Sequence, residues 1–286
     1  MMASRIGSFI AITALYLAFC AGFTFAQSAG NLSALIKSSD AEQRRTAIYL
    51  LRLDCRPDSV RPVVFLANDP LPIVRASAAP LFACLPTQEA EPLLAQLLTD
   101  ESSFVRKEAA YAFSKFTDSR ESLALISAFG RETDPEVKAA IVVSLGAIGG
   151  QEAVHLLVRL LQKRPNLESS FLLAAAARSI GQIAQRLSTG CFDSTIPQSF
   201  LPGKFKNLSR ANSLEAVPEF EIAIRPLESI AADERKEYDV RRAAIFSLGT
   251  IGSERSLAVV RSAAVSSDPF LSEIAREALV RLGEKP

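Results

Sequence analysis

The chain has 286 residues, 49% of them hydrophobic, and it contains no tryptophan. Its 32 Lys and Arg residues almost balance its 31 Asp and Glu residues, so the protein as a whole offers no bulk electrostatic attraction to nucleic acids or anionic membranes. With one histidine and no Cys-x-x-Cys motif, a zinc site or a histidine-based catalytic triad has little to build from.

The first segment, residues 1–26, differs from the rest because Arg5 is its only charge. The apolar or small run over residues 6–25 ends in a plausible cleavage site before Gln27, a pattern typical of a secretory signal peptide. The run is also long enough to span a bilayer, so an uncleaved anchor is the alternative. Either way we expect an exported protein, periplasmic or secreted, or one anchored with its body outside the cytoplasm.

Helical repeats follow this leader. The sixteen-residue phrase 134–149, DPEVKAAIVVSLGAIG, recurs at 237–252 and 268–283. The valine of the phrase, Val137, follows the equivalent Val105 by 32 residues. A period in the low thirties made of two helices is typical of a helical solenoid.

In chain order we expect repeats 1–5 within residues 27–184, an inserted loop at 185–214, and repeats 6–7 within 215–286. The loop is predicted because 185–214 has no helical period and is rich in Ser, Pro, Gly and Asn. The repeats after the first are predicted to open at Pro62, Pro92, Leu123, His155, Pro218 or Pro226, and Leu257. Pro80 should kink or end the second helix of repeat 2.

The second helix of each repeat is apolar almost all round, which indicates that neighbouring repeats cover it on several sides. An N-cap residue precedes the helix and a glycine follows it in the best copies. The structural repeat positions that define this helix are Asp134, Val137, Lys138, Leu145 and Gly149, with Val240, Arg241 and Gly252 in the later copy.

The pattern Asp-Pro-x-Val-Arg-x-x-Ala…Leu-Gly-x-Ile-Gly resembles the HEAT repeat, in particular the short PBS lyase HEAT-like form found in bilin-lyase-like families. The resemblance covers nearly all of residues 32–283 except the insertion. It implies an all-α fold, an α-α superhelix (a HEAT-like solenoid) of about seven two-helix repeats. Such repeats serve many unrelated proteins, so function has to be argued from sites.

A basic residue follows the buried valine in several repeats, and it offers two interpretations. The basic residues form either a ligand-binding ladder along the concave face or a structural ladder that meets the turn aspartates of adjacent repeats. We favour the structural ladder because the acids belong to the same motif. The basic positions are Arg44, Arg75, Arg106, Lys138 and Arg241, the acids include Asp69, Asp100 and Asp134, and Leu173 and Ser272 interrupt the series.

Catalytic chemistry finds little support in the sequence. His155, the only histidine, lies near the start of a predicted helix, and acidic pairs such as Asp233 and Glu234 are typical of solvated turns. We therefore predict no catalytic residue, no metal site and no cofactor. The alternative implied by the resemblance is a bilin-lyase-like accessory enzyme, or a chaperone acting on a protein substrate.

Three cysteines remain after the leader, Cys55, Cys84 and Cys191, and an odd count leaves at least one outside any internal pair. Cys55 and Cys84 lie near the ends of second helices in adjacent repeats. A disulfide between them is possible in an oxidising compartment, but two buried thiols are the favoured expectation.

The insertion is the favoured binding segment because loops grafted on rigid scaffolds often carry recognition. A spacer without a partner is the alternative. We expect a non-catalytic exported scaffold that binds another protein through its concave face and this loop, with no nucleic-acid partner and a membrane contact only through an uncleaved anchor. The possible partner-binding residues are Phe192, Phe200, Lys204, Phe205, Lys206 and Arg210.

Overall fold

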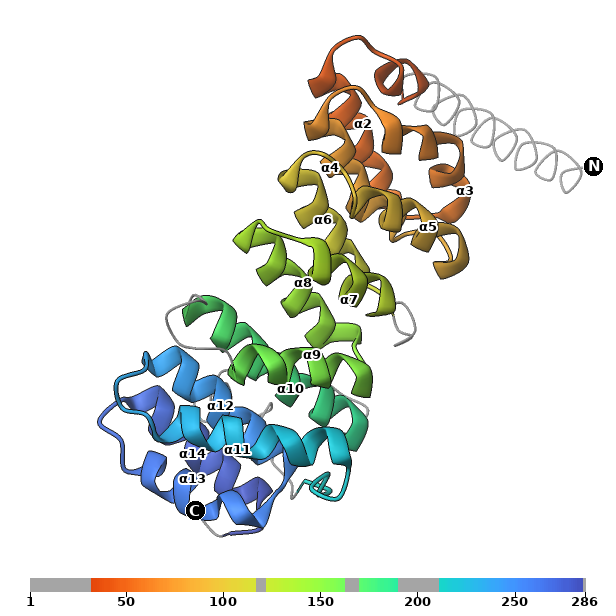
Figure 1. Cartoon of the computed structure of the whole chain (residues 1–286). Coiled ribbons are helices and arrows are strands. Elements are labelled where there is room, and N and C mark those ends of the chain that lie inside the picture. Colours follow the sequence, from red (N-terminus) through yellow and green to blue (C-terminus); the bar gives the residue numbers. More distant parts are fainter. Residues whose placement is uncertain (1–31, 117–121, 163–169, 190–210, 285–286) are drawn as a thin grey trace, which may run out of the picture.

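The computed structural model describes residues 32–116, 122–162, 170–189 and 211–284 (Figure 1). The predicted leader and the six predicted partner-binding residues of the insertion lie outside these ranges. All regular structure within them is helical, and none of these helices combines the length and apolar character needed to cross a membrane.

Two rows of helices make up the array. The first helices of the repeats are the short helix 32–36, α3 (Pro57–Val60) with the 3-10 helix Arg61–Asn68, α5 (Thr87–Leu97), α7 (Ser122–Arg131), α9 (Gln151–Gln162), α11 (Pro218–Ala232) and α13 (Leu257–Ala264). The second helices are α2 (Ala41–Asp54), α4 (Pro72–Phe82), α6 (Ser103–Phe113), α8 (Pro135–Ile148), α10 (Ser170–Thr189), α12 (Tyr238–Ile251) and α14 (Pro269–Arg281).

Each second helix packs on the second helix of the next repeat, from α2 through α14. Figure 1 shows α2, α4, α6 and α8 following one another along one side of the array and α3, α5 and α7 along the other. This arrangement confirms the predicted all-α solenoid of seven two-helix repeats. The second helices contact one another more extensively than the first helices do, so the array bends toward them.

The repeat phrase forms α8 as a capped and buried helix. Asp134 lies at the N-cap, where its carboxylate accepts the backbone N–H groups of Glu136 and Val137 at 2.8 and 3.2 Å. Val137 and Leu145 are almost completely buried. Gly149 ends the helix with φ −62°. At this position a Cβ would lie 2.7 Å from that of Ala153, so close packing excludes a side chain.

The later copy, α12, has the same burial and a different ending. Val240 is buried and Leu248 is fully buried. Gly252 ends α12 in the left-handed region, with φ 74°. A Cβ on Gly252 would also lie 3.2 Å from the Cα of Ser213, so both the backbone conformation and a crossing segment require glycine here.

The predicted helix starts at two prolines are wrong. Pro92 lies inside α5, which begins at Thr87, and Pro226 lies inside α11, which runs unbroken from Pro218. Each proline lacks the N–H that would bond to the residue four positions earlier. Those earlier residues, Gln88 and Ile222, are exposed, so water can take the place of the missing donor.

Pro80 lies inside α4, which ends at Phe82. The proline-free helix α6 ends at the equivalent position, Phe113, so the end of α4 is not an effect of Pro80. Pro62 is the second residue of the 3-10 helix Arg61–Asn68, not the first residue of the repeat's first helix, which begins at Pro57.

The described boundaries of the insertion differ from the predicted ones. The helix α10 continues through Thr189, past the predicted repeat end at residue 184. On the other side the structure describes 211–214, where Leu214 donates its N–H to the carbonyl of Ile251 at 2.8 Å. Only residues 190–210 lie between these two described segments.

Cys55 and Cys84 form a disulfide that joins the C-terminal ends of α2 and α4, with their Cα atoms 5.2 Å apart. The expectation of two buried thiols is therefore wrong. Cys55 is exposed and Cys84 is half-buried, because both lie just beyond the helices' last buried turns.

Candidate functional site

Three of the five recurring basic residues, Arg44, Arg75 and Arg106, form a structural ladder. Arg44 donates from Nε and Nη2 to the carboxylate of Asp69 at 2.7 and 2.9 Å. Arg75 binds Asp100 in the same bidentate way at 2.7 and 2.8 Å. Both pairs are at least nine-tenths buried, so these guanidinium groups hold neighbouring repeats together instead of facing a ligand.

The third rung uses a different acid from the one expected. Arg106 binds Glu132 at 2.7 and 3.0 Å, not Asp134. Glu132 also accepts the N–H groups of Thr133 and Asp134 at 2.9 Å. Glu132 lies five residues before Val137, as Asp100 lies five residues before Val105. Asp134 instead lies at the N-cap of α8, so the third rung keeps the register of the first two.

The ladder does not continue at the two remaining basic positions in the described part of the chain. Lys138 makes no ion pair there, and Arg241 donates to the backbone carbonyl of Ala231 at 3.0 Å. Arg241 also lies 5.9 Å from the centre of the Tyr238 ring. The structure therefore has three rungs, all in repeats 1–4.

The ladder shifts the pKa values of Asp100 and Glu132 downward. Burial favours the protonated form of Asp100, but hydrogen bonds from Arg75 and from the backbone N–H of Ser102 outweigh it and lower the pKa. The pKa of Glu132 is lowered in the same way: burial raises it, but the hydrogen bonds from Arg106 and from the backbone N–H groups of Thr133 and Asp134 together outweigh burial. These carboxylates are thus ionised structural partners.

The second-helix face, meaning the exposed surface of α2, α4, α6, α8 and α10, carries the candidate binding site. Four aromatic side chains lie on it with exposed fractions between 41% and 63%: Tyr49, Phe104, Tyr111 and Phe171. Aromatic rings left exposed on one face of a repeat array are typical of a surface that binds a partner.

The first pocket, pocket A, lies between α2 and α6 and has a volume of about 260 Å³. Tyr49 of α2 and Phe104 of α6 form opposite walls. The intervening helix α4 supplies small floor residues such as Ala76 and Ser77. Ile73 and Pro80 of the same helix complete the α4 side of the pocket.

The second pocket, pocket B, repeats this arrangement two repeats later, with a volume of about 470 Å³. Tyr111 of α6 and Phe171 of α10 form its walls. The intervening helix α8 contributes Pro135 and Ala139 to the lining. Walls and floors therefore alternate along the face.

Glu108 lines both pockets and so marks the point where they meet. It lies on α6 between Phe104 and Tyr111, four residues after the first and three before the second, on one side of the helix. The adjacent Lys107 is engaged with Glu136 of α8 at 2.7 Å. Glu108 itself makes no ion pair with any residue that the structure describes.

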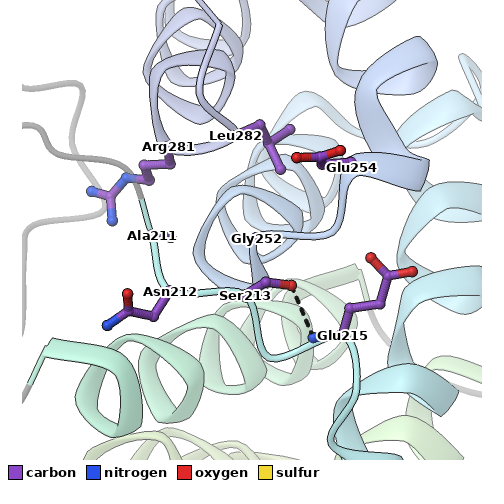
Figure 2. A pocket seen from close by; sticks show the side chains of 8 residues that line it. All are labelled: Ala211, Asn212, Ser213, Glu215, Gly252, Glu254, Arg281 and Leu282. Atoms are coloured by element: carbon purple, nitrogen blue, oxygen red, sulfur yellow. Dashed lines mark hydrogen bonds between the residues drawn. The ribbon is translucent and has the colours of Figure 1, made fainter.

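A third pocket, of about 410 Å³, lies at the C-terminal end beside the returning insertion. Figure 2 shows Ala211, Asn212 and Ser213 crossing past Gly252 at the ends of α12 and α14. The hydroxyl of Ser213 accepts the N–H of Glu215 at 3.3 Å. This crossing segment is held by backbone hydrogen bonds, which indicates a structural role.

The described residues contain no group of three or more His, Cys, Asp or Glu side chains arranged to hold a metal ion. His155 lies on α9, half exposed, with Nε2 3.9 Å from a carboxylate oxygen of Glu219. This pair alone gives no catalytic arrangement.

The aromatic residues of pockets A and B were missed in the sequence reasoning. A usable signal exists in the position before the buried valine or leucine, which is aromatic in Phe104, Phe171 and Phe270. Two of these rings face a cation of the chain itself, Phe104 with Lys107 at 5.7 Å and Phe270 with Arg242 at 5.3 Å, so the recurrence marks the exposed face of the second helices and not a ligand by itself.

Fold and ladder together define the class of this protein: it is an α-solenoid built from HEAT-type helix pairs. The family comparison agrees. A model of HEAT repeats matches residues 63–129, and the PBS lyase HEAT-like repeat matches residues 137–163 and 240–266. The chain thus contains HEAT repeats, including the short PBS lyase HEAT-like form, over these residues, as its sequence pattern predicts.

Several solved structures are similar in fold. The complex of CpcE and CpcF of phycocyanin lyase from a Nostoc species is 21% identical, covering 87% of this chain and 85% of that chain, with a TM-score of 0.46. A designed armadillo repeat protein in complex with the peptide (KR)4 is 17% identical, covering 88% and 98%, with a TM-score of 0.43.

Human deoxyhypusine hydroxylase in complex with glycerol is 16% identical, covering 94% of this chain and 100% of that chain, with a TM-score of 0.38. These likenesses concern the fold alone. A search of curated protein sequences found no match.

Proposed function

We propose that this protein is a non-catalytic, exported scaffold that binds a segment of another protein on its second-helix face. The observation that carries the proposal is the pair of aromatic-walled pockets on that face, Tyr49 with Phe104 and Tyr111 with Phe171. A stacked array presents such pockets at set positions, which limits the ordering cost of association.

The disulfide supports the exported location. Cys55 and Cys84 come from adjacent repeats and lie near the surface, where a cytosolic reductant would reach them. Disulfides persist in oxidising compartments and are rare in the cytosol. This argument is independent of the leader, and it favours the periplasm or the extracellular space.

The insertion is proposed as a second contact for the same partner. Its candidate residues include Phe192, Phe200 and Lys204, which combine apolar and basic side chains. The insertion leaves the array after Thr189, at the opposite end of α10 from Phe171 of pocket B, so it would contact the partner outside that pocket.

Site-specific photo-cross-linking tests the proposal. A photoreactive phenylalanine analogue replaces Tyr111 in the full chain, expressed in its own source organism. We expect one dominant cross-linked protein, attached through a defined stretch of its sequence. The same analogue at Phe65, an exposed position in the first-helix row, is the control. Equal cross-linking from both positions would contradict a specific binding face.

An accessory lyase is the second candidate, favoured by the match of residues 137–163 and 240–266 to the PBS lyase HEAT-like repeat. The two candidates differ in compartment, because bilin attachment belongs to the cytoplasmic side. Mass spectrometry of the protein purified from its source distinguishes them. A mature N-terminus at Gln27 favours the exported scaffold, and an uncleaved cytoplasmic chain favours the lyase.

A further inference from the structure

We propose that the second-helix face binds one extended peptide segment with two apolar side chains about five or six residues apart and a single Lys or Arg between them. This inference rests on the proposed function and specifies its ligand. The two apolar side chains would occupy pockets A and B, and the basic side chain would meet Glu108.

The spacing of the anchors follows from the geometry of the array. Pocket A lies over α4 and pocket B lies over α8, so two helix-to-helix steps separate their floors. Packed helices lie about 8–10 Å apart, which gives roughly 16–20 Å between the pockets. An extended chain advances about 3.3 Å per residue. The two anchors are therefore about five or six residues apart.

The surroundings of Glu108 indicate that the peptide carries a basic residue between its two apolar side chains. Phe104 and Tyr111 flank this carboxylate along α6. The Lys107 ammonium group already lies 5.7 Å from the centre of the Phe104 ring, so Tyr111 is the ring that adds to the attraction of Glu108 for a further cation. Lys107 does not neutralise Glu108 fully, because its ammonium group is bound to Glu136. A Lys or Arg of the partner complements this position.

The charge at the pocket A end excludes a run of basic residues. Pocket A is lined by Arg45 and Arg52 of α2 in addition to its aromatic walls. Arg45 is paired with Glu42, and Arg52 has no ion pair among the described side chains. A polybasic segment would be repelled at this end, so one central basic residue flanked by apolar residues fits best.

An unbiased peptide selection tests the ligand. A phage library of random 16-residue peptides is selected on the immobilised full chain. The selected peptides should share two apolar residues five or six positions apart with Lys or Arg between them. A fluorescein-labelled selected peptide then reports binding by fluorescence anisotropy.

Exposed substitutions then locate the bound peptide. We expect Phe171→Ala to weaken binding about tenfold, and Glu108→Gln to weaken it about threefold. Glu108→Lys should shift the selection toward peptides with a central acid. The matched controls are Phe65→Ala and Glu152→Gln in the first-helix row, both expected to leave binding unchanged, and circular dichroism checks that every variant is folded.

The outcomes separate this inference from the proposed function. Selected peptides that depend on Phe171 but lack the spacing or the basic residue would overturn the inference and leave the binding face intact. Peptides that bind Phe171→Ala and Tyr49→Ala as tightly as the parent chain would contradict both. A selection that enriches no sequence would also overturn the inference.

Discussion

The backbone N–H of Ala211 donates a 2.9 Å hydrogen bond to the carbonyl oxygen of Arg281, the last residue of α14. The backbone N–H of Leu214 likewise donates to the carbonyl oxygen of Ile251, the last residue of α12. Asn212 donates to the carbonyl of Ser188 in the last turn of α10 at 3.4 Å. One short segment therefore donates hydrogen bonds to carbonyl groups at the C-terminal ends of three successive second helices, which have no partner within the helix.

The other side of the insertion acts on the preceding helix. The guanidinium of Arg186 donates to the carbonyls of Gly146, Ala147 and Gly149 at the end of α8. Burial lowers the pKa of Arg186, and these three carbonyls compensate the buried charge. Residues on both sides of 190–210 thus belong to the repeat array.

We predict that the extent of a deletion decides its effect on stability. Replacing 190–210 by a short Gly-Ser linker should leave the thermal melting temperature nearly unchanged, because Asn212 and Ser188 already lie in contact. Removing 185–214 should lower it by several degrees, because it leaves helix-end carbonyls without partners. Circular dichroism melting curves of the two deletions check this, and equal melting temperatures would contradict it.

We predict acid-sensitive stability from the ladder. The folded-state pKa values of Asp100 and Glu132 lie below their unfolded values, which are about 3.9 and 4.3. Their contribution is therefore complete above about pH 5 and is lost as the pH falls through the folded pKa values. Asp100→Asn should lower the urea midpoint at pH 7. The urea midpoint of this variant should also fall less between pH 5 and pH 3 than that of the parent chain.

The disulfide provides the control for this pH experiment. A Cys55→Ser/Cys84→Ser variant should lower the urea midpoint by a similar amount at both pH values, because a disulfide does not titrate. An Asp100→Asn variant that keeps the full acid sensitivity of the parent would show that the ladder is not its source.

We predict that reduction destabilises the N-terminal repeats. The disulfide closes a sequence separation of 29 residues, for which chain entropy gives about 3.6 kcal/mol. Adding a thiol reductant should lower the melting temperature of the parent chain and leave a Cys84→Ser variant unaffected. Thiol titration of the denatured protein checks the oxidised state; three reactive thiols in the mature chain before reduction would rule the bond out.

We predict opposite effects for two glycine substitutions. A Cβ on Gly181 would lie 2.8 Å from ring carbons of Phe246 and closer still to the hydroxyl of Ser247, so Gly181→Ala should destabilise by about 1–3 kcal/mol. Gly130 in α7 has no atom within 4 Å of its Cβ position, so Gly130→Ala should stabilise by about 0.5–1 kcal/mol. Urea unfolding of both variants measures the difference.

Serine and glycine explain why the second helices of the later repeats pack so closely. The hydroxyl of Ser179 donates to the carbonyl of Val142 at 2.9 Å, and that of Ser247 donates to the carbonyl of Ala177 at 2.6 Å. The sequence shows these small residues, but it does not show which neighbour each one meets.

Much of the fold follows from local sequence. The caps, the apolar periodicity and the spacing of residues such as Val105 and Val137 predicted two-helix repeats, because each of these signals acts within one or two helical turns. The Pro92 and Pro226 predictions failed because a proline inside a helix depends on whether water reaches the residue four positions earlier.

The candidate site could not be predicted in the same way. Pockets A and B arise where a helix with small residues lies between two helices with exposed rings, and these helices are separated by whole repeats in the sequence. The third rung, Arg106 with Glu132, differs from the pockets because it follows the repeat register: Glu132 precedes Val137 by the same five residues that separate Asp100 from Val105.

The sequence by itself determined that this protein is a helical repeat array, which helices are buried, and which acids and bases recur. Only the tertiary structure decided that Cys55 and Cys84 are joined, that the segments beside the insertion hold the helix ends, and that the aromatic rings share one face. The physical reason is range: periodicity and capping act along a helix, whereas pairing and exposure are set by neighbours about thirty residues away or more.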